Sequence, residues 1–401
     1  MGLITESLNR KVIVYKRLGQ VHPVRMIPHE ALTQTGWNRR RLVAGLLMAG
    51  AAPALLAAKP SPPTRPMVRS RMRPKLLPAR PVEVFDPRLL DLVDADSGFD
   101  VISTNHTFTE GPVWDDFRGR LYFTDIPANR VHRWSEREGT RILLDPANDH
   151  SDTPDGERTD GANGLAMTAN GRLVLANHGH RNVETFDPDT GARQVLAERY
   201  RGRRFSSPND LAFGADDSLF FTDAVYGLKG GLDSERVEMD EHAVYRLRPG
   251  GEVERWIDGL TMPNGLSFAP DFSALYVSET RPAKPVVHRF ALGPDHRVES
   301  RETIARFQPF MDDGYRGICD GMCMAASGHV FQGGPGGVYV LAPDGAMLGR
   351  LNTGRLAANC AFGEDGRSLF VTAHELVLRL RTRIGGAHIR RAPPGWTPAA
   401  P

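Results

Sequence analysis

Hydrophobic and polar residues alternate in short runs along most of the chain, which is the pattern of half-buried β-strands. One run recurs with a common form: a turn signal, an aliphatic residue, further apolar residues, and usually a small or polar end such as Thr-Asp. Its six copies are GRLYFTD (119–125), GRLVLAN (171–177), DSLFFTD (217–223), SALYVSE (273–279), GHVFQGG (328–334) and RSLFVTA (367–373). Successive copies lie about 40 to 56 residues apart, the span of a four-stranded propeller blade. The pattern predicts an all-β, six-bladed β-propeller.

A second repeated element lies about 14 residues before the end of each copy, where a polar residue begins an apolar strand. Equivalent positions in successive blades are related by rotation about the channel axis, so we expect these polar residues to meet in one ring. A single Asn or Asp more often caps a turn, but six in phase favour a shared site. The members are Glu110, Asn163, Asn209 with Asp210, Asn264, Asp320 and Asn359.

The predicted ring presents carboxylate and amide oxygens with few cationic side chains among them. Carboxylates that face one another repel unless a cation compensates their charge. Ca²⁺ suits such a site because it takes about 6–8 oxygen ligands in flexible geometry. The ring therefore predicts a divalent cation, with Ca²⁺ first and Zn²⁺, Mn²⁺ or Mg²⁺ as alternatives.

Several segments together resemble the gluconolactonase branch of the senescence-marker-protein, gluconolactonase and luciferin-regenerating-enzyme family. They are EGPVWDD at Glu110, SSPNDLAF and FTDAVYGL between 206 and 228, MPNGLSF (262–268), DGMCM (320–324) and ANCAFGEDG (358–366). The resemblance covers about residues 83–390. It implies a six-bladed propeller with a cation, usually calcium, at the channel mouth. The metal ligands that it implies are Glu110, Asn209, Asn264 and Asp320.

The resemblance implies a metal-dependent hydrolase that opens a sugar lactone, of the gluconolactonase type. A cation polarises the lactone carbonyl and activates water, and a nearby carboxylate must then take a proton. Asp320 is the first candidate for this base and Asp210 the second, although Asp320 can also serve as a ligand alone. Asn163, Asn209 and Tyr226 are the candidate substrate-binding residues, with a core position as the alternative for Tyr226.

Two other functions fit the same motifs. One is hydrolysis of other lactones or of organophosphorus esters at the same cation. The other is a non-catalytic ligand-binding propeller in which the ion is structural. No Gly-x-Ser-x-Gly elbow occurs, so covalent catalysis is not supported. His178 and His180 alternate on a segment that reads as extended, which predicts that both face one side, as a metal pair or as polar contacts near the channel.

Composition narrows the partners. A formal net charge of +2 gives no reason to expect nucleic acid or an anionic membrane as a partner. The small-molecule lactone is the partner that the family resemblance implies. The three cysteines are an odd number and do not form a closed disulfide framework, so buried or lightly exposed thiols are predicted. The sequence does not specify the oligomeric state.

The N-terminal region differs from the rest of the chain. Arginines 39–41 precede an apolar run of about 16 residues that ends in small residues, the form of an export signal of the twin-arginine type. An uncleaved anchor is the alternative, and Met26 is a second candidate start. The predicted division is an export signal region at 1–58, a Pro/Arg-rich disordered linker at 59–82, the propeller at 83–390 and a C-terminal tail at 391–401. The mature chain is expected in the periplasm, without stable membrane insertion.

Overall fold

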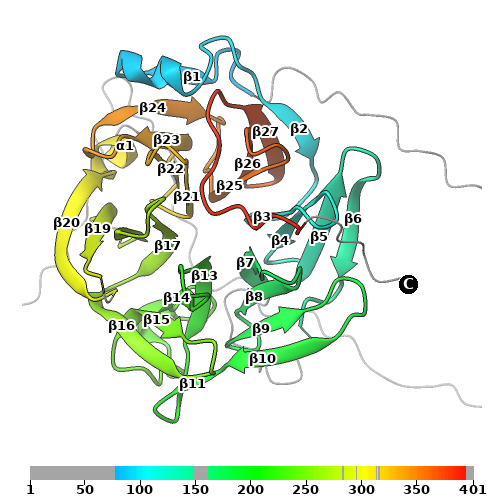
Figure 1. Ribbon diagram of the computed structural model, residues 1–401, viewed down its shortest axis with the longest axis vertical. Helices are drawn as coiled ribbons and strands as arrows, with labels where there is room; N and C mark the ends of the chain where they lie inside the picture. Colours follow the sequence, from blue (N-terminus) through cyan, green and yellow to red (C-terminus); the bar gives the residue numbers. More distant parts are fainter. Residues whose placement is uncertain are drawn as a thin grey trace, which may run out of the picture. The chain divides into compact units, whose positions relative to one another are not determined.

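Six antiparallel sheets stand around a central axis, and the predicted six-bladed propeller is confirmed (Figure 1). Each sheet is one blade, and blades are numbered here in chain order. Blade 1 consists of β3 (Thr109–Asp115), β4 (Arg120–Asp125), β5 (Arg130–Ser135) and β6 (Gly139–Leu144). Blade 2 consists of β7 (Ala162–Met167), β8 (Leu173–Asn177), β9 (Asn182–Phe186) and β10 (Arg193–Ala197). Blade 3 consists of β13 (Ser207–Phe213), β14 (Leu219–Ala224), β15 (His242–Leu247) and β16 (Val253–Leu260).

The remaining blades complete the ring. Blade 4 consists of β17 (Pro263–Phe268), β18 (Ala274–Glu279), β19 (Val286–Leu292) and β20 (Val298–Arg306). Blade 5 consists of β21 (Met322–Met324), β22 (Val330–Gly334), β23 (Gly337–Leu341), β24 (Met347–Asn352) and β1 (Val82–Val84). Blade 6 consists of β25 (Asn359–Gly363), β26 (Ser368–Ala373), β27 (Leu376–Arg381) and β2 (Asp100–Ser103). The shorter elements are η2 (Pro87–Asp91), η3 (Gly231–Asp233), α1 (Gln308–Asp312), β11 (Arg199–Tyr200) and β12 (Arg203–Arg204).

The computed structural model describes residues 77–148, 161–281, 284–294, 296–312, 314 and 317–393. The predicted export signal at 1–58 and most of the linker at 59–82 lie outside this range, so both stay predictions. Within this range, no helix combines the length and the apolar character that crossing a bilayer requires.

Each of the six repeated runs forms the second strand of its blade, and these strands are almost completely buried. The burial comes from packing between blades, since each of six apolar clusters joins two neighbouring blades. Tyr122 and Leu165, for example, lie in the cluster between blades 1 and 2. An inner strand that is covered on both faces needs apolar residues on both, which explains the near-continuous apolar runs.

The start of the chain closes the ring. Strand β2 pairs with β27, with Asp100 opposite Arg379, and becomes the outer strand of blade 6. Strand β1 pairs with β24 and adds a fifth strand to blade 5, with Val82 opposite Leu351. Leu77 and Val82 pack against the cluster between blades 5 and 6, so the last residues of the predicted linker belong to the propeller.

The C-terminal segment 386–392, here called the strap, crosses the face that carries the turns between first and second strands (Figure 1, red). Gly386 forms a β-bridge with Ala325 of blade 5, and His388 Nε2 donates to Phe268 O and Ala269 O of blade 4 at 3.1 and 3.0 Å. Further ion pairs join the strap to blades 3 and 1: Arg390 with Asp217 at 2.7 Å and Arg391 with Asp116 at 2.8 Å. The propeller therefore extends past the predicted boundary at residue 390.

Candidate metal and active site

The predicted polar residues lie at irregular points of the innermost strands. The register of β3, β7, β13 and β17 shifts just after Glu110, Ala162, Pro208 and Pro263 respectively, which marks a β-bulge in each strand. A bulge places two residues against one on the partner strand and turns a side chain away from the regular alternation. Glu110, Asn163, Asn209 and Asn264 thus occupy equivalent positions, and Asp320 holds the corresponding place just before β21. These five residues are called the polar ring below.

Glycines follow four of the five ring residues because neighbouring strands approach there. A Cβ on Gly164 would lie 2.5 Å from Asn209 O, and one on Gly265 would lie 2.5 Å from the Cα of Gly321. A Cβ on Gly321 would lie 2.0 Å from Cγ of Asn359. Each contact is too short for any side chain, so the glycines allow the inner strands to close around a narrow channel.

The Thr or Ser near the end of several repeated runs donates a hydrogen bond to the backbone carbonyl of the polar-ring residue in the next blade. Thr124 Oγ1 donates to Asn163 O at 3.0 Å, and Thr222 Oγ1 donates to Asn264 O at 2.7 Å. Ser278 Oγ donates to Asp320 O at 2.6 Å. The recurring Thr or Ser of these runs is therefore a link between blades, which accounts for its repetition.

Asn359 was expected in the ring but lies one residue deeper, beside Asp210. The backbone N–H of Asp210 donates to Thr222 Oγ1, and that of Asn359 donates to Thr372 Oγ1, both at 3.1 Å. The backbone N–H of Gly265 makes the same type of bond in its blade, to Ser278 Oγ at 2.9 Å. Asp210 and Asn359 therefore match the glycine positions. The cause is the regular pairing of β25 with β26, which lacks the bulge that offsets the other strands.

Three carboxylates converge where the ring and this deeper layer meet. Glu110, Asp210 and Asp320 are buried, and burial raises the pKa of all three. The charges of Asp320 and Asp210 raise the pKa of Glu110 further, whereas the Gly111 N–H, 2.7 Å from Oε2, opposes the rise. The pKa of Asp210 reaches about 7. None of the three carboxylates forms an ion pair with a lysine or arginine of the described part of the chain.

This donor set fits a hard divalent cation. Asn264 donates to the Asp320 carboxylate, and Asn359 donates to both Asp210 and Glu110, so side-chain amides and carboxylates gather in one place. Asn209 is buried in the equivalent bulge of β13, next to Asp210. Three buried like charges without a basic partner are costly, and oxygen ligands that share a cation remove that cost.

The candidate substrate residues lie near this cluster. Tyr226 follows β14, and its hydroxyl donates to Met262 O at 2.9 Å and contacts Thr280 Oγ1. Burial and then the Asp320 charge raise its pKa, so the phenol stays protonated. Asn163 Nδ2 lies 3.3 Å from His178 Nε2, and burial lowers the pKa of His178 to about 3.

The prediction that His178 and His180 share one face of an extended segment is wrong. Both lie in the turn between β8 and β9, which ends at Arg181 with a φ of 54°. His180 Nδ1 instead faces Glu184 Oε2 at 3.5 Å. The turn sends the two rings to different partners.

A cavity of about 450 Å³ extends from the deeper layer toward the strap. Asp210 and Asn359 line one end, and His388 lies at the other. Cys323 and Cys360 also line it, with their Sγ atoms 3.4 Å apart. All three cysteines are free thiols and two of them are buried, as predicted; the contact between β21 and β25 was not expected.

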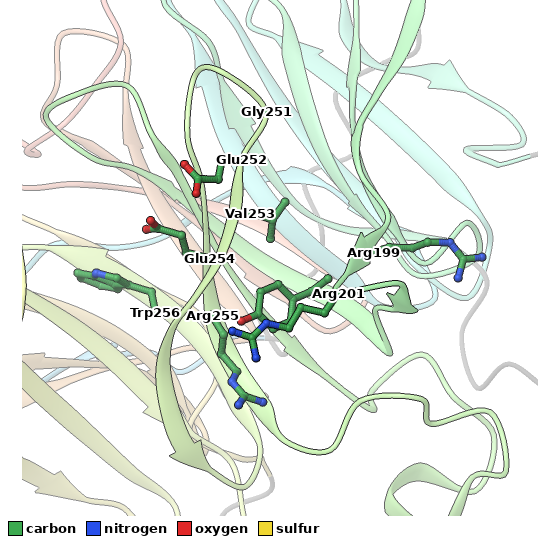
Figure 2. Close-up of a pocket in the computed structure, with 9 residues that line it drawn as sticks. Arg199, Arg201, Gly251, Glu252, Val253, Glu254, Arg255 and Trp256 are labelled. Carbon is green, nitrogen blue, oxygen red and sulfur yellow. The ribbon is translucent and has the colours of Figure 1, made fainter.

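A groove of about 650 Å³ lies on the outer edge of blade 3, and Figure 2 shows the residues that line it. It lies between β11 and β16 and is lined by charged residues of both signs, among them Arg199, Glu254 and Arg255. No member of the polar ring lines this groove. The convergence of buried carboxylates therefore places the candidate site in the channel.

The comparison with known families agrees with this geometry. The model of the family "SMP-30/Gluconolactonase/LRE-like region" matches residues 108–375, which is more than half of the chain. The chain belongs to this family. The match spans all six first strands and the whole polar ring, so the family motifs and the buried carboxylates coincide.

Individual relatives carry lactonase names. A gluconolactonase of Zymomonas mobilis is 37% identical over 306 residues, covering 75% of this chain and 86% of that protein. A pentonolactonase of Haloferax volcanii is 26% identical, over 68% of this chain and 83% of that protein. The solved structure of a gluconolactonase from Xanthomonas campestris superposes with a TM-score of 0.65 at 31% identity, covering 75% of this chain and 94% of its own.

Proposed function

We propose that this protein hydrolyses sugar lactones with the help of a divalent cation, Ca²⁺ in the first instance, held in the channel. The observation that carries the proposal is the convergence of Glu110, Asp210 and Asp320, three buried carboxylates without a basic partner. The proposed ligands are Glu110, Asn209, Asn264 and Asp320. The names of the family relatives support the substrate class, since they act on sugar lactones.

A bound cation would polarise the lactone carbonyl and favour deprotonation of water. Asp320 is the proposed general base, because its carboxylate lies in the ring next to Asn264, whereas Asp210 lies one residue deeper. Its carboxylate oxygen accepts the proton of the attacking water while the new C–O bond forms. The same proton then passes to the ring oxygen as the lactone C–O bond breaks, giving a hydroxy acid.

Asn163, Asn209 and Tyr226 are proposed to bind the sugar hydroxyls. Amides and a protonated phenol hydrogen-bond hydroxyl groups without changing charge near neutral pH. The Tyr226 hydroxyl is held in place by Met262 O, to which it donates, and by its contact with Thr280 Oγ1. Asp210 is proposed to hold Asn359 and thereby to position the amide that also bonds Glu110.

The test is the initial rate of acid release from glucono-1,5-lactone, followed in a pH-stat and corrected for spontaneous hydrolysis. An acyl-homoserine lactone and a phosphotriester serve as competing substrates. We expect the highest kcat/KM on the sugar lactone, loss of turnover with EDTA and recovery with Ca²⁺. A chelator-insensitive rate would refute the role of the cation, and a higher kcat/KM on either competitor would refute the substrate class.

We also propose export to the periplasm through the arginines that precede the apolar run, which lie outside the described residues. Replacing Arg40 and Arg41 by lysine keeps the charge but removes the guanidinium pair. We expect the double variant to accumulate in the cytoplasm while the parent chain reaches the periplasmic fraction. Equal periplasmic amounts would contradict the twin-arginine assignment.

A further inference from the structure

A cluster of metal-binding side chains lies outside the channel, on blade 1. His106 precedes β3, Asp125 ends β4 and His132 lies in β5; one ligand atom from each falls within 4.8 Å of the others. The side chains of His106 and Asp125 are 6% and 5% exposed, and His132 is 7% exposed. No member of the polar ring belongs to this cluster.

His132 is the unusual member, because both of its ring nitrogens are buried without a hydrogen-bond partner. Its ring stacks on Phe123 with centroids 5.2 Å apart and meets the edge of His106 at 4.7 Å. A buried imidazole without partners loses its hydration and gains nothing in return. Burial, followed by the charge of His106, lowers its pKa to about 4, which leaves it neutral and able to donate a lone pair.

His106 and Asp125 are already oriented as ligands usually are. His106 Nε2 lies 2.6 Å from Ser103 Oγ, which leaves Nδ1 facing Asp125 Oδ2 at 3.6 Å. That separation is long for a hydrogen bond but close to the roughly 3.4 Å between two ligands of a tetrahedral Zn²⁺ ion. The Asp125 oxygens accept the Thr107 and Phe108 N–H groups, both at 3.0 Å, and each oxygen keeps a further lone pair.

Blade 4 provides an internal comparison. His288 occupies the register position of His132, and Glu279 that of Asp125. In blade 4 the positive charge comes from an arginine side chain, because Arg301 Nη2 lies 2.7 Å from His288 Nε2 and 3.4 Å from Glu279 Oε2.

In blade 1 the residue equivalent to Arg301 is Thr140. Thr140 pairs with Trp134, two residues after His132, just as Arg301 pairs with Phe290, two residues after His288. Thr140 Oγ1 donates to Ser103 Oγ and supplies no charge. Arg130, the next basic residue after Asp125, pairs with Asp145 at 2.9 Å. Blade 1 therefore keeps the acid and the histidine of blade 4, adds a second histidine, and lacks the guanidinium.

We propose that His106, Asp125 and His132 bind a first-row divalent transition ion of the Zn²⁺ type. Two imidazoles and one carboxylate suit Zn²⁺, whereas the all-oxygen ligands of the channel suit Ca²⁺. The burial of all three side chains gives the ion a structural role. It joins the segment that follows β2 of blade 6 to strands β4 and β5 of blade 1, at the place where the propeller closes.

The test is metal content of the full-length protein after stripping, incubation with Zn²⁺ and Ca²⁺ together, and gel filtration. We expect about one tightly bound Zn²⁺ per chain in the parent. His132→Phe should lose this Zn²⁺ while retaining Ca²⁺. His288→Phe, at the matched position of blade 4, should keep the Zn²⁺. Zn²⁺ should raise Tm of the parent and of His288→Phe but leave Tm of His132→Phe unchanged.

His106→Gln is the second variant, since glutamine retains a partner for Ser103, and it decides the outcome if His132→Phe does not fold. Absence of tightly bound Zn²⁺ in the parent would overturn the proposal, as would equal Zn²⁺ content in the parent and the folded variants. These measurements do not use lactone turnover. Failure of this proposal is therefore distinguishable from failure of the proposed hydrolase activity.

Discussion

Asn359 Nδ2 donates to Asp210 Oδ2 at 3.4 Å and joins blade 6 to blade 3 across the channel. Blades 3 and 6 are opposite one another in a six-bladed ring, so this hydrogen bond lies beneath the polar ring and spans the axis. Asn359 also bonds Glu110 of blade 1. One neutral amide thus connects two buried carboxylates that would otherwise face each other directly.

Asp320→Asn tests the general base. We expect kcat for the sugar lactone to fall by about 10²–10⁴, the usual contribution of general acid–base catalysis. Tm of the EDTA-treated protein should be unchanged or higher, because the substitution removes one of three repelling charges. Measurement requires a pH-stat and a thermal melt of the same preparation.

Asp223→Asn is the matched control for that variant. Asp223 is also a buried aspartate, but it accepts the Ser206 and Ser207 N–H groups at 2.9 and 2.8 Å and lies outside the ring. An amide leaves one of these donors facing an NH₂ group, so Tm should fall while kcat is retained. Similar kinetic losses in both variants would argue against a specific role for Asp320.

Without the cation, the contribution of the buried channel carboxyl groups to the free energy of unfolding should fall as the pH rises. Burial raises the pKa of Asp210 to about 7 and of Asp320 to about 8, so between about pH 4 and 8 these two carboxyl groups bind more protons in the folded protein than in the unfolded chain. Stability from these groups is therefore lost as pH rises through this window.

A bound cation favours the ionised form of these carboxyl groups and should therefore remove their contribution to the pH dependence of stability. We expect Tm in EDTA to fall relative to Tm in Ca²⁺ between pH 5 and about pH 8, and the difference to be smaller in Asp210→Asn. Other buried groups, such as His178, contribute equally under both conditions and cancel in the difference. Parallel curves would count against a cation at these carboxylates.

Gly265→Ala tests the close approach of the inner strands. The added methyl group would lie 2.5 Å from the Cα of Gly321, so neighbouring backbone must move, at a cost of about 1–3 kcal/mol. Gly98→Ala is the control, because nothing lies within 4 Å of its Cβ position. Urea denaturation should give a lower midpoint for Gly265→Ala alone; equal midpoints would contradict the packing described for the channel.

The strap should restrict access to the channel from the turn face. A chain that ends at Gly385 lacks the contacts of His388, Arg390 and Arg391, whereas one that ends at Pro393 keeps them. We expect Ca²⁺ to be removed by excess EDTA several-fold faster from the shorter chain, as followed with a fluorescent calcium indicator. Identical rates would mean that the ion exchanges only through the opposite mouth.

The sequence predicted the six blades and most of the ring because both follow from repetition. Thr124, Thr222 and Ser278 recur at one place in the repeated runs, and the structure gives each the same bond to the next blade. The depth of Asn359 was not predictable in this way. It depends on whether a strand contains a bulge, and a bulge of one residue leaves little trace in an apolar pattern.

Contacts between distant segments were also missed. β1 is only three residues long and begins at Val82, the last residue of the predicted linker. The cluster of His106, Asp125 and His132 combines a loop residue with residues of two strands, which are brought together only by the folding of blade 1. Ser103 at the end of β2 also accepts a hydrogen bond from Thr140 of blade 1, a contact between blades that the spacing along the chain does not indicate.

The pairing of β2 with β27 has a consequence for synthesis on the ribosome. The strand Asp100–Ser103 is translated before the other strands of all six blades except β1, whereas its partner Leu376–Arg381 is translated after all of them. Until then β2 has no partner, and an unpaired strand edge is a template for association with other chains. The nascent polypeptide therefore carries this unpaired edge while the strands of blades 1 to 5 are made.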